Sequence, residues 1–121
     1  MSRSILVVED QEDNRQILRD LLNNAGYDMS EAENGADALA AFAKKRPDLI
    51  LMDIQLPIMD GYEATRRLKA DPATKSIPII VVTSYALSGD ESKARSSGCD
   101  AYVTKPYSPR ALLAKIKEFL P

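Results

Sequence analysis

The chain of 121 residues is 45% hydrophobic, with 16 basic and 18 acidic residues and a net charge of −2. This length suits one domain over residues 1–121, and the hydrophobic share is enough for a real core. The charge balance argues against a nucleic-acid module driven by bulk positive charge, and no segment approaches the ~20 apolar residues of a membrane span.

Two residue counts narrow the possible chemistry. Histidine is absent, which removes the Ser-His-Asp triad and the commonest zinc ligand. The single cysteine, Cys99, cannot form an internal disulfide and is interpreted as a small buried hydrophobe. Residues 1–10 show no signal-peptide pattern, so we expect a cytoplasmic protein whose chemistry relies on carboxylates, hydroxyls and lysine.

Apolar runs alternate with helical patterns along the chain. Five segments have strand character, at residues 4–8, 27–32, 48–52, 77–82 and 101–105. Five segments favour helices, at residues 17–25, 36–46, 62–70, 88–98 and 109–120. The expected apolar stripe of the first helix comprises Ile17, Leu18, Leu21, Leu22 and Ala25.

Local signals mark several ends of these elements. The first helix is expected to end at Gly26, a typical residue just past a helix. The last helix is expected to begin with Ser108 as N-cap and Pro109 at the first helical position. Asp60-Gly61 is interpreted as a structural turn in which Gly61 is free to take a positive φ.

The alternation predicts an α/β fold, a doubly wound five-stranded parallel sheet with helices on both faces. The runs ILVV, LILM and IIVV are continuously apolar, as expected for strands covered on both sides. Residues 27–32 and 101–105 are mixed, as expected for edge strands. Strands 1, 3 and 4 inside and strands 2 and 5 outside match the flavodoxin-like order 2-1-3-4-5.

Polar residues stand where the predicted strands end, and open parallel sheets bind ligands beyond that end, here between strands 1 and 3. In chain order these residues are Glu9, Asp10, Asp53, Thr83, Ser84 and Lys105. Crowded carboxylates repel one another unless a cation joins them, and Mg²⁺ prefers oxygen ligands of this kind. A carboxylate beside Mg²⁺ can attack phosphorus, and Lys105 and Thr83 suit the neutralisation of phosphoryl oxygens.

Four motifs, in order and spacing, carry a resemblance to a known family. They are VVED at 7–10, LILMDIQLPIMDG at 49–61, IPIIVVTSYA at 77–86 and AYVTKP at 101–106. Over essentially its whole length the chain resembles the receiver domains of bacterial two-component response regulators, and among them the stand-alone, DivK-like kind without an output domain.

The resemblance implies a metal site and a phosphoacceptor. Asp53 would accept the phosphoryl group. Asp10 and Asp53 would bind Mg²⁺ directly, Glu9 would assist through water, and the backbone carbonyl of Gln55 would complete the protein ligands. Thr83 and Lys105 would bind the phosphoryl oxygens.

Further roles follow from the same resemblance. Tyr102 would be an aromatic switch that turns inward when Thr83 moves. Pro106 would follow a cis peptide bond. Gln55 and Tyr85 hold positions that tune the phosphoryl lifetime, and we hypothesise that Tyr85 shields the group from water. Ser84 departs from the usual alanine or glycine of the family.

The implied function is a switch rather than an enzyme acting on other substrates. A histidine kinase or a histidine phosphotransfer protein would phosphorylate Asp53, and the face formed by the last two strands and helices would change its affinity for a downstream protein target. No nucleic acid or membrane partner is implied, and the chain would be a monomer or a weak phosphorylation-dependent dimer.

Other interpretations remain open. A phosphohydrolase of the haloacid dehalogenase kind also uses a strand-end aspartate with Mg²⁺, but it needs a second aspartate where this chain has Gln55. A receiver-like scaffold that never takes phosphate would keep the fold. Individually, Asp53 could cap a turn, Lys105 could guard a sheet edge, and Tyr102 could belong to the core.

Overall fold

The computed structural model describes residues 3–54, 56, 58–83, 92, 95–105 and 107–120, without the side chains at 42, 43 and 83. The strands are β1 (Ser4–Val8), β2 (Asp28–Ala32), β3 (Leu49–Asp53), β4 (Ile79–Thr83) and β5 (Ala101–Thr104). The helices are α1 (Glu12–Asn24), α2 (Gly35–Lys44), α3 (Gly61–Ala70) and α5 (Pro109–Phe119). The expected helix over 88–98 lies largely outside the described residues.

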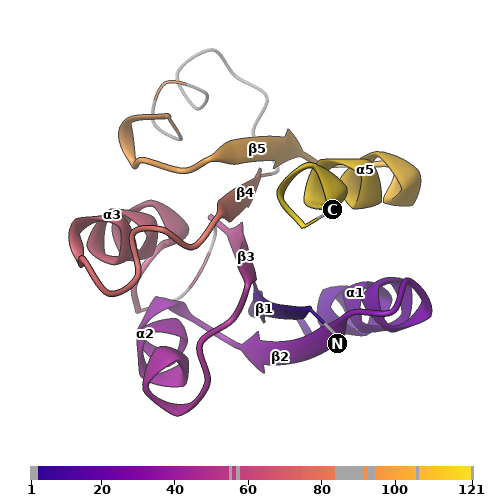
Figure 1. Ribbon diagram of the computed structural model, residues 1–121, viewed down its shortest axis with the longest axis horizontal. Coiled ribbons are helices and arrows are strands. Elements are labelled where there is room, and N and C mark those ends of the chain that lie inside the picture. The colour runs from indigo at the N-terminus through magenta and orange to yellow at the C-terminus, as the bar shows by residue number, and fades with distance from the viewer. Residues whose placement is uncertain are drawn as a thin grey trace.

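The strands form one parallel sheet in the order β2-β1-β3-β4-β5, which confirms the predicted topology. Helices α1 and α5 cover one face of the sheet, and α2 and α3 cover the other (Figure 1). None of the described helices has the length and apolar character needed to cross a membrane.

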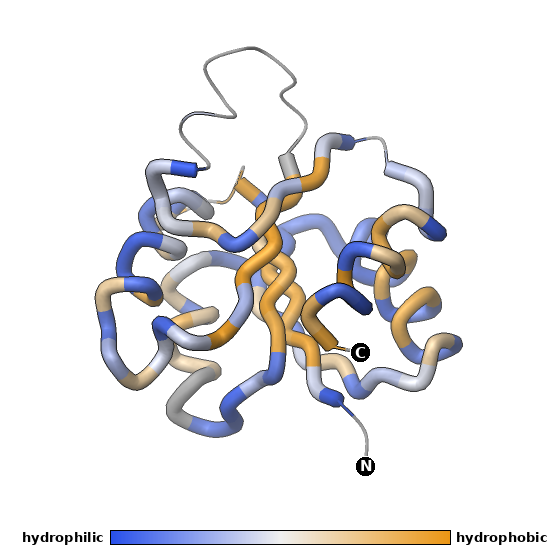
Figure 2. The backbone as a smooth tube through the Cα atoms, turned by 45° about the horizontal axis from the view of Figure 1, so that its top comes forward, coloured by the Kyte–Doolittle hydropathy of each residue, from blue (hydrophilic) through white to orange (hydrophobic). Residues whose placement is uncertain are grey.

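Two hydrophobic clusters hold the layers together because alternate strand residues point to opposite faces. On β1, Ile5 packs with the cluster of α1 and α5, whereas Leu6 packs with that of α2 and α3. The backbone trace is strongly hydrophobic along the central strands (Figure 2). All five residues of β1 and of β3 are buried, whereas no residue of β5 is, as the apolar pattern predicts.

Helix ends follow the sequence signals closely. The Ser108 side chain accepts a hydrogen bond from the Ala111 amide at 3.3 Å, with Pro109 opening α5. Gly26 has a φ of +91° just after α1, as expected for a residue that stops a helix.

One expectation about α1 is wrong. Ile17 is 57% exposed, whereas Leu18 and Leu22 are buried. Leu18 and Leu22 are four residues apart and so share one helix face, and Arg15 lies one turn before Leu18 on that face and is buried too. The spacing of the apolar residues alone could not show that a buried arginine, rather than Ile17, belongs to this stripe.

Candidate functional site

The candidate site lies at the carboxyl edge of the sheet, where β1 and β3 run side by side. Val8 pairs with Met52, so Glu9 and Asp53, the residues that follow, emerge at the same level. Oxygen atoms of Glu9, Asp10 and Asp53 lie within 4.8 Å of one another. Glu9 and Asp53 are buried, and Asp10 is partly exposed.

Lys105 reaches this cluster from the end of β5, although β4 separates β5 from β3 in the sheet. Its Nζ lies 3.2 Å from Glu9 Oε1 and 3.5 Å from Asp53 Oδ1. Its side chain is only 24% exposed, so these contacts are poorly screened by solvent. The long lysine stem therefore places one cation against two buried carboxylates.

Backbone amides also orient the carboxylates. The Gln11 amide donates to Glu9 Oε2 at 3.1 Å, and the Ile54 amide donates to Asp53 Oδ1 at 2.8 Å. Both amides belong to the loops that leave the strands. The loops thus hold the acidic side chains in place as well as connecting the elements.

Burial and mutual repulsion shift the pKa values of the three carboxyl groups. Burial alone would raise the pKa of Glu9, but the Gln11 amide and Lys105 outweigh it and lower that pKa. Burial and the nearby charge of Glu9 raise the pKa of Asp53 to about 6, against the opposing effect of Lys105. Desolvation and Glu9 also raise the pKa of Asp10. One lysine therefore does not compensate the three carboxylates fully.

The donor set fits a hard divalent cation. All three groups offer oxygen, they converge within one ion's reach, and the raised pKa values of Asp10 and Asp53 show that additional positive charge would be favourable. Mg²⁺ characteristically takes one or two carboxylates and keeps several waters, which suits a cluster with a partly exposed member.

A cavity of about 510 Å³ opens beside the cluster. Asp53 and Lys105 line one part of it, and apolar side chains that include Ile17, Tyr107 and Pro109 line another. A reacting group could thus approach Asp53 while its carrier rests on an apolar wall between α1 and the start of α5. Ile17 is therefore exposed at this cavity instead of packing in the core.

The structure brings together four of the predicted site residues, Glu9, Asp10, Asp53 and Lys105. Thr83 is the last residue of β4, and its side chain lies outside the described part of the chain. Tyr102 lies on β5, half-buried against the α2/α3 cluster, with the Arg95 guanidinium 5.8 Å from its ring centre. Predicted roles also fall on Gln55, Ser84, Tyr85 and Pro106, which lie outside the described residues.

Two observations correct or extend the expectations from the sequence. Gly61 does not take a positive φ; among the described glycines, those that do are Gly26 and Gly98. Gly61 opens α3 after the N-cap Asp60, and its α-carbon packs on the main chain of Asp53. Arg15, whose Nη1 donates to the Glu9 carbonyl at 2.7 Å, contacts the acidic loop, and no motif predicted this contact.

Cys99 is half-buried rather than fully buried, and burial raises the pKa of its thiol.

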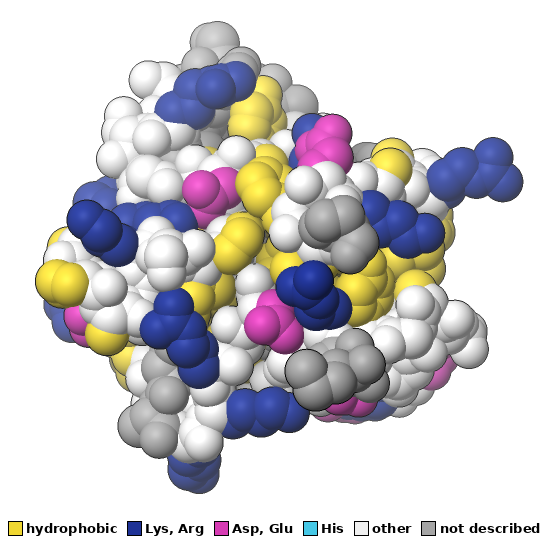
Figure 3. All heavy atoms as spheres, in the orientation of Figure 1, with side chains coloured by type: hydrophobic (Ala, Val, Ile, Leu, Met, Phe, Trp, Pro, Cys, Tyr) yellow, Lys and Arg dark blue, Asp and Glu magenta, His cyan; other side chains and the backbone are white. Residues whose placement is uncertain are grey.

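On the face shown in Figure 3, lysine and arginine side chains are dispersed among acidic and uncharged ones. The described lysine and arginine side chains on this face therefore do not form one continuous positive patch.

Comparisons with known proteins find relatives over almost the whole chain. The family model of the response regulator receiver domain matches residues 5–117. The polar-differentiation response regulator DivK of Brucella anthropi is 45% identical over 120 residues, covering 99% of this chain and 98% of the relative. DivK of Brucella ovis is 43% identical over the same extent.

Solved structures show the same fold. The receiver domain of the sensor histidine kinase PA1611 from Pseudomonas aeruginosa, which has a magnesium ion coordinated in its active-site cleft, is 32% identical with a TM-score of 0.91, over 99% of this chain and 98% of that one. The chemotaxis protein CheY4 of Vibrio cholerae is 28% identical with a TM-score of 0.91, over 98% of this chain and 99% of that one.

Proposed function

Because the chain belongs to the response regulator receiver domain family of two-component systems, we propose that it is a single-domain phosphorylation switch in which Asp53 accepts a phosphoryl group. The observation that carries this proposal is the convergence of Asp53 with Glu9, Asp10 and Lys105 at one edge of the sheet. The donor would be a histidine kinase or a histidine phosphotransfer protein, in the cytoplasm of a bacterium.

The geometry of Asp53 supports its role as nucleophile. Oδ1 accepts a bond from the Ile54 amide and faces Lys105, which leaves Oδ2 to form the new bond to phosphorus. The phosphorus–nitrogen bond to the donor histidine breaks, and the leaving imidazole keeps the bonding pair and takes up a proton. The ionised Asp53 carboxylate is the nucleophile, and in the metal-free protein burial and Glu9 raise its pKa to about 6.

Glu9, Asp10, Asp53 and the Gln55 carbonyl would hold Mg²⁺. When bound, the ion neutralises charge on the phosphoryl oxygens during transfer. The Lys105 ammonium lies close to Asp53 Oδ1 and would pair with a further phosphoryl oxygen. Its contact with Glu9 would then be lost. The apolar wall near Ile17 and Tyr107 would receive the donor protein.

Transfer would then switch the protein. The new dianionic group would draw Thr83 and Lys105 toward it. Tyr102 would then turn inward and change the face formed by β4, β5, α5 and the helix expected over 88–98. Full switching from 1:99 to 99:1 needs about 5.5 kcal/mol of differential stabilisation. The downstream partner would be a protein, and the chain would be a monomer or a weak phosphorylation-dependent dimer.

The test is intact mass spectrometry after incubation with acetyl phosphate and Mg²⁺. The expected result is gain of one phosphoryl group, lost with EDTA and in Asp53→Asn but kept in Asp20→Asn, which removes an exposed carboxylate of α1. If the wild type gains no phosphoryl group and also fails to bind beryllofluoride, the switch proposal is wrong and a scaffold that never takes phosphate is the better description.

A further inference from the structure

Arg15 connects the acidic loop to the rest of the fold. It lies on α1 and is only 7% exposed, which is unusual for an arginine. Its Nη1 donates a buried hydrogen bond to the main-chain carbonyl of Glu9 at 2.7 Å. This carbonyl belongs to the peptide between Glu9 and Asp10, the first two carboxylates of the candidate metal site.

The Glu9 carbonyl belongs to no helix or strand, so its hydrogen-bond partner has to come from another part of the fold. β1 ends at Val8 and α1 begins at Glu12, so residue 9 lies in neither element. The other polar groups of Glu9 are engaged: its amide donates to the Ala32 carbonyl, and its carboxylate contacts the Gln11 amide and Lys105. With Arg15 on its carbonyl, Glu9 is held at every hydrogen-bonding group.

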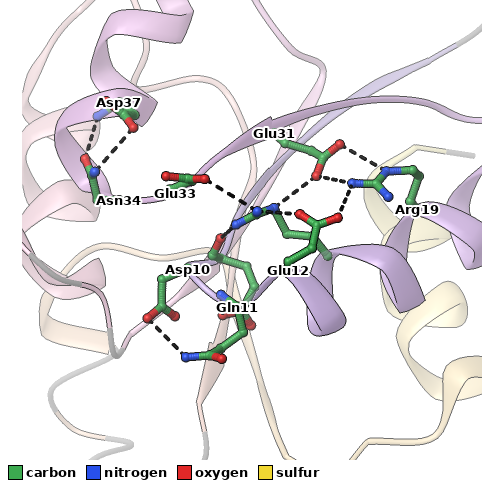
Figure 4. Close-up of polar contacts among 10 residues, drawn as sticks. Asp10, Gln11, Glu12, Arg19, Glu31, Glu33, Asn34 and Asp37 are labelled. Carbon is green, nitrogen blue, oxygen red and sulfur yellow. Dashed lines mark hydrogen bonds and ion pairs between the residues drawn. The ribbon is translucent and has the colours of Figure 1, made fainter.

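The remaining nitrogens of Arg15 anchor the guanidinium. Nε lies 3.1 Å from Glu31 on β2, and Nη2 contacts Glu33 at 3.5 Å and also Glu12. Figure 4 shows Glu12, Glu31 and Glu33 directed toward this one place from α1, β2 and the segment after β2. A planar fork with five donors can serve these groups together, whereas a lysine ammonium cannot.

We propose that Arg15 is a positioning residue that fixes the peptide between Glu9 and Asp10, so that both carboxylates converge with Asp53. The consequence for Mg²⁺ rests on the proposed function, but the positioning of the loop does not. Substitution of residues that hydrogen-bond to metal ligands without contacting the metal typically changes metal affinity by about 10–100-fold.

Arg19 provides a matched comparison. It lies one turn further along α1 and shares Glu12 and Glu31 with Arg15. Within the described part of the chain its hydrogen bonds and ion pairs are all with side chains, including Gln16, so it belongs to the same charge network without holding the acidic loop. A role that depended only on the positive charge within the network would not distinguish the two arginines.

The first measurement is the Mg²⁺ dissociation constant by calorimetry for the wild type, Arg15→Lys and Arg19→Lys. We expect Arg15→Lys to weaken binding about 10-fold and Arg19→Lys to change it less than about 2-fold. Circular dichroism at the working temperature confirms that each variant is folded. Arg15→Met, which keeps an apolar stem, is the second variant if Arg15→Lys does not fold.

The second measurement is amide hydrogen exchange of Gln11 in EDTA, where no metal contributes. Exchange should be faster in Arg15→Lys than in Arg19→Lys, because the Gln11 amide is bonded to the Glu9 carboxylate. Equal exchange in the two variants would overturn the inference, and so would faster exchange with unchanged Mg²⁺ affinity. If the wild type binds no Mg²⁺, the metal step of the proposed function fails, and exchange alone decides on Arg15.

Discussion

The α-carbon of Gly61 packs directly against the main-chain carbonyl of Asp53. A β-carbon at position 61 would lie 2.1 Å from that oxygen and 2.9 Å from its carbon. The Gly61 amide also donates to the Ile54 carbonyl at 3.1 Å. The first turn of α3 thus packs closely on the backbone at the end of β3.

Gly61→Ala is therefore expected to lower the free energy of unfolding by at least about 2 kcal/mol and to impair phosphorylation of Asp53, because only backbone movement relieves the overlap. Gly26→Ala is the control. A β-carbon at position 26 would meet nothing within 4 Å, so the positive φ alone should cost about 1–2 kcal/mol and phosphorylation should continue. Chemical denaturation and acetyl phosphate labelling measure both effects, and equal labelling of the two variants would contradict this account.

The ionisation of Asp53 should make stability depend on pH. Its pKa is about 6 in the folded protein and 3.8 as the ordinary value, so the folded state binds more protons between these values. Stability of the metal-free protein should therefore fall as pH rises from about 4 to about 6 and stay lower above that, by on the order of 3 kcal/mol. The lowered pKa of Glu9 acts with the opposite sign, but below its ordinary value of 4.5.

Asp53→Asn removes this titration. In EDTA the variant should be more stable than the wild type at about pH 7.5, and the advantage should largely disappear at about pH 4.5. Asp20→Asn removes one exposed charge and should show no such dependence. Thermal unfolding at the two pH values decides, and an Asp53→Asn advantage of equal size at both would refute the link to the Asp53 carboxyl.

Lys105→Met tests the lysine as counter-charge. Without it, the buried carboxylates of Glu9 and Asp53 face each other with no lysine between them, which should cost about 1–3 kcal/mol at about pH 7.5 in EDTA. Lys115→Met breaks an exposed ion pair with Glu118 and should cost less than about 1 kcal/mol. Urea denaturation of both variants provides the comparison, and similar losses would mean that Lys105 is not a structural counter-charge.

Much of the fold could be predicted because it depends on local patterns. Continuous apolar runs identified β1, β3 and β4 as central strands, and the carboxyl ends of parallel strands necessarily share one edge. That rule places Glu9, Asp53 and Lys105 at one edge, and the length of the lysine side chain then lets Lys105 reach the two carboxylates across β4.

What the sequence did not predict depends on close approach between distant segments. Gly61 looked like a turn glycine, because the residues next to it in the sequence do not indicate its contact with the Asp53 carbonyl. No sequence pattern indicated the burial of Arg15, since its bond to the Glu9 carbonyl depends on how α1 packs on β1 and β2. Ile17 was assigned to the core because helical spacing does not locate the edge of a buried stripe.

A pair of threonines near the α3 side of the core offers a test of buried hydroxyls. Thr65 is fully buried on α3, and its Oγ1 has no hydrogen-bond partner among the described residues. Thr74 is also buried, but its Oγ1 donates to the Leu68 carbonyl at 2.6 Å. A buried hydroxyl without a partner carries its full desolvation cost, whereas a bonded one contributes to stability.

Thr65→Val should therefore raise the free energy of unfolding by about 1 kcal/mol, because valine keeps the shape and removes the unsatisfied group. Thr74→Val should lower it by about 1 kcal/mol or more, because the Leu68 carbonyl loses its donor. Urea denaturation gives both values, and a loss of stability in Thr65→Val would show that its hydroxyl has a partner in solution.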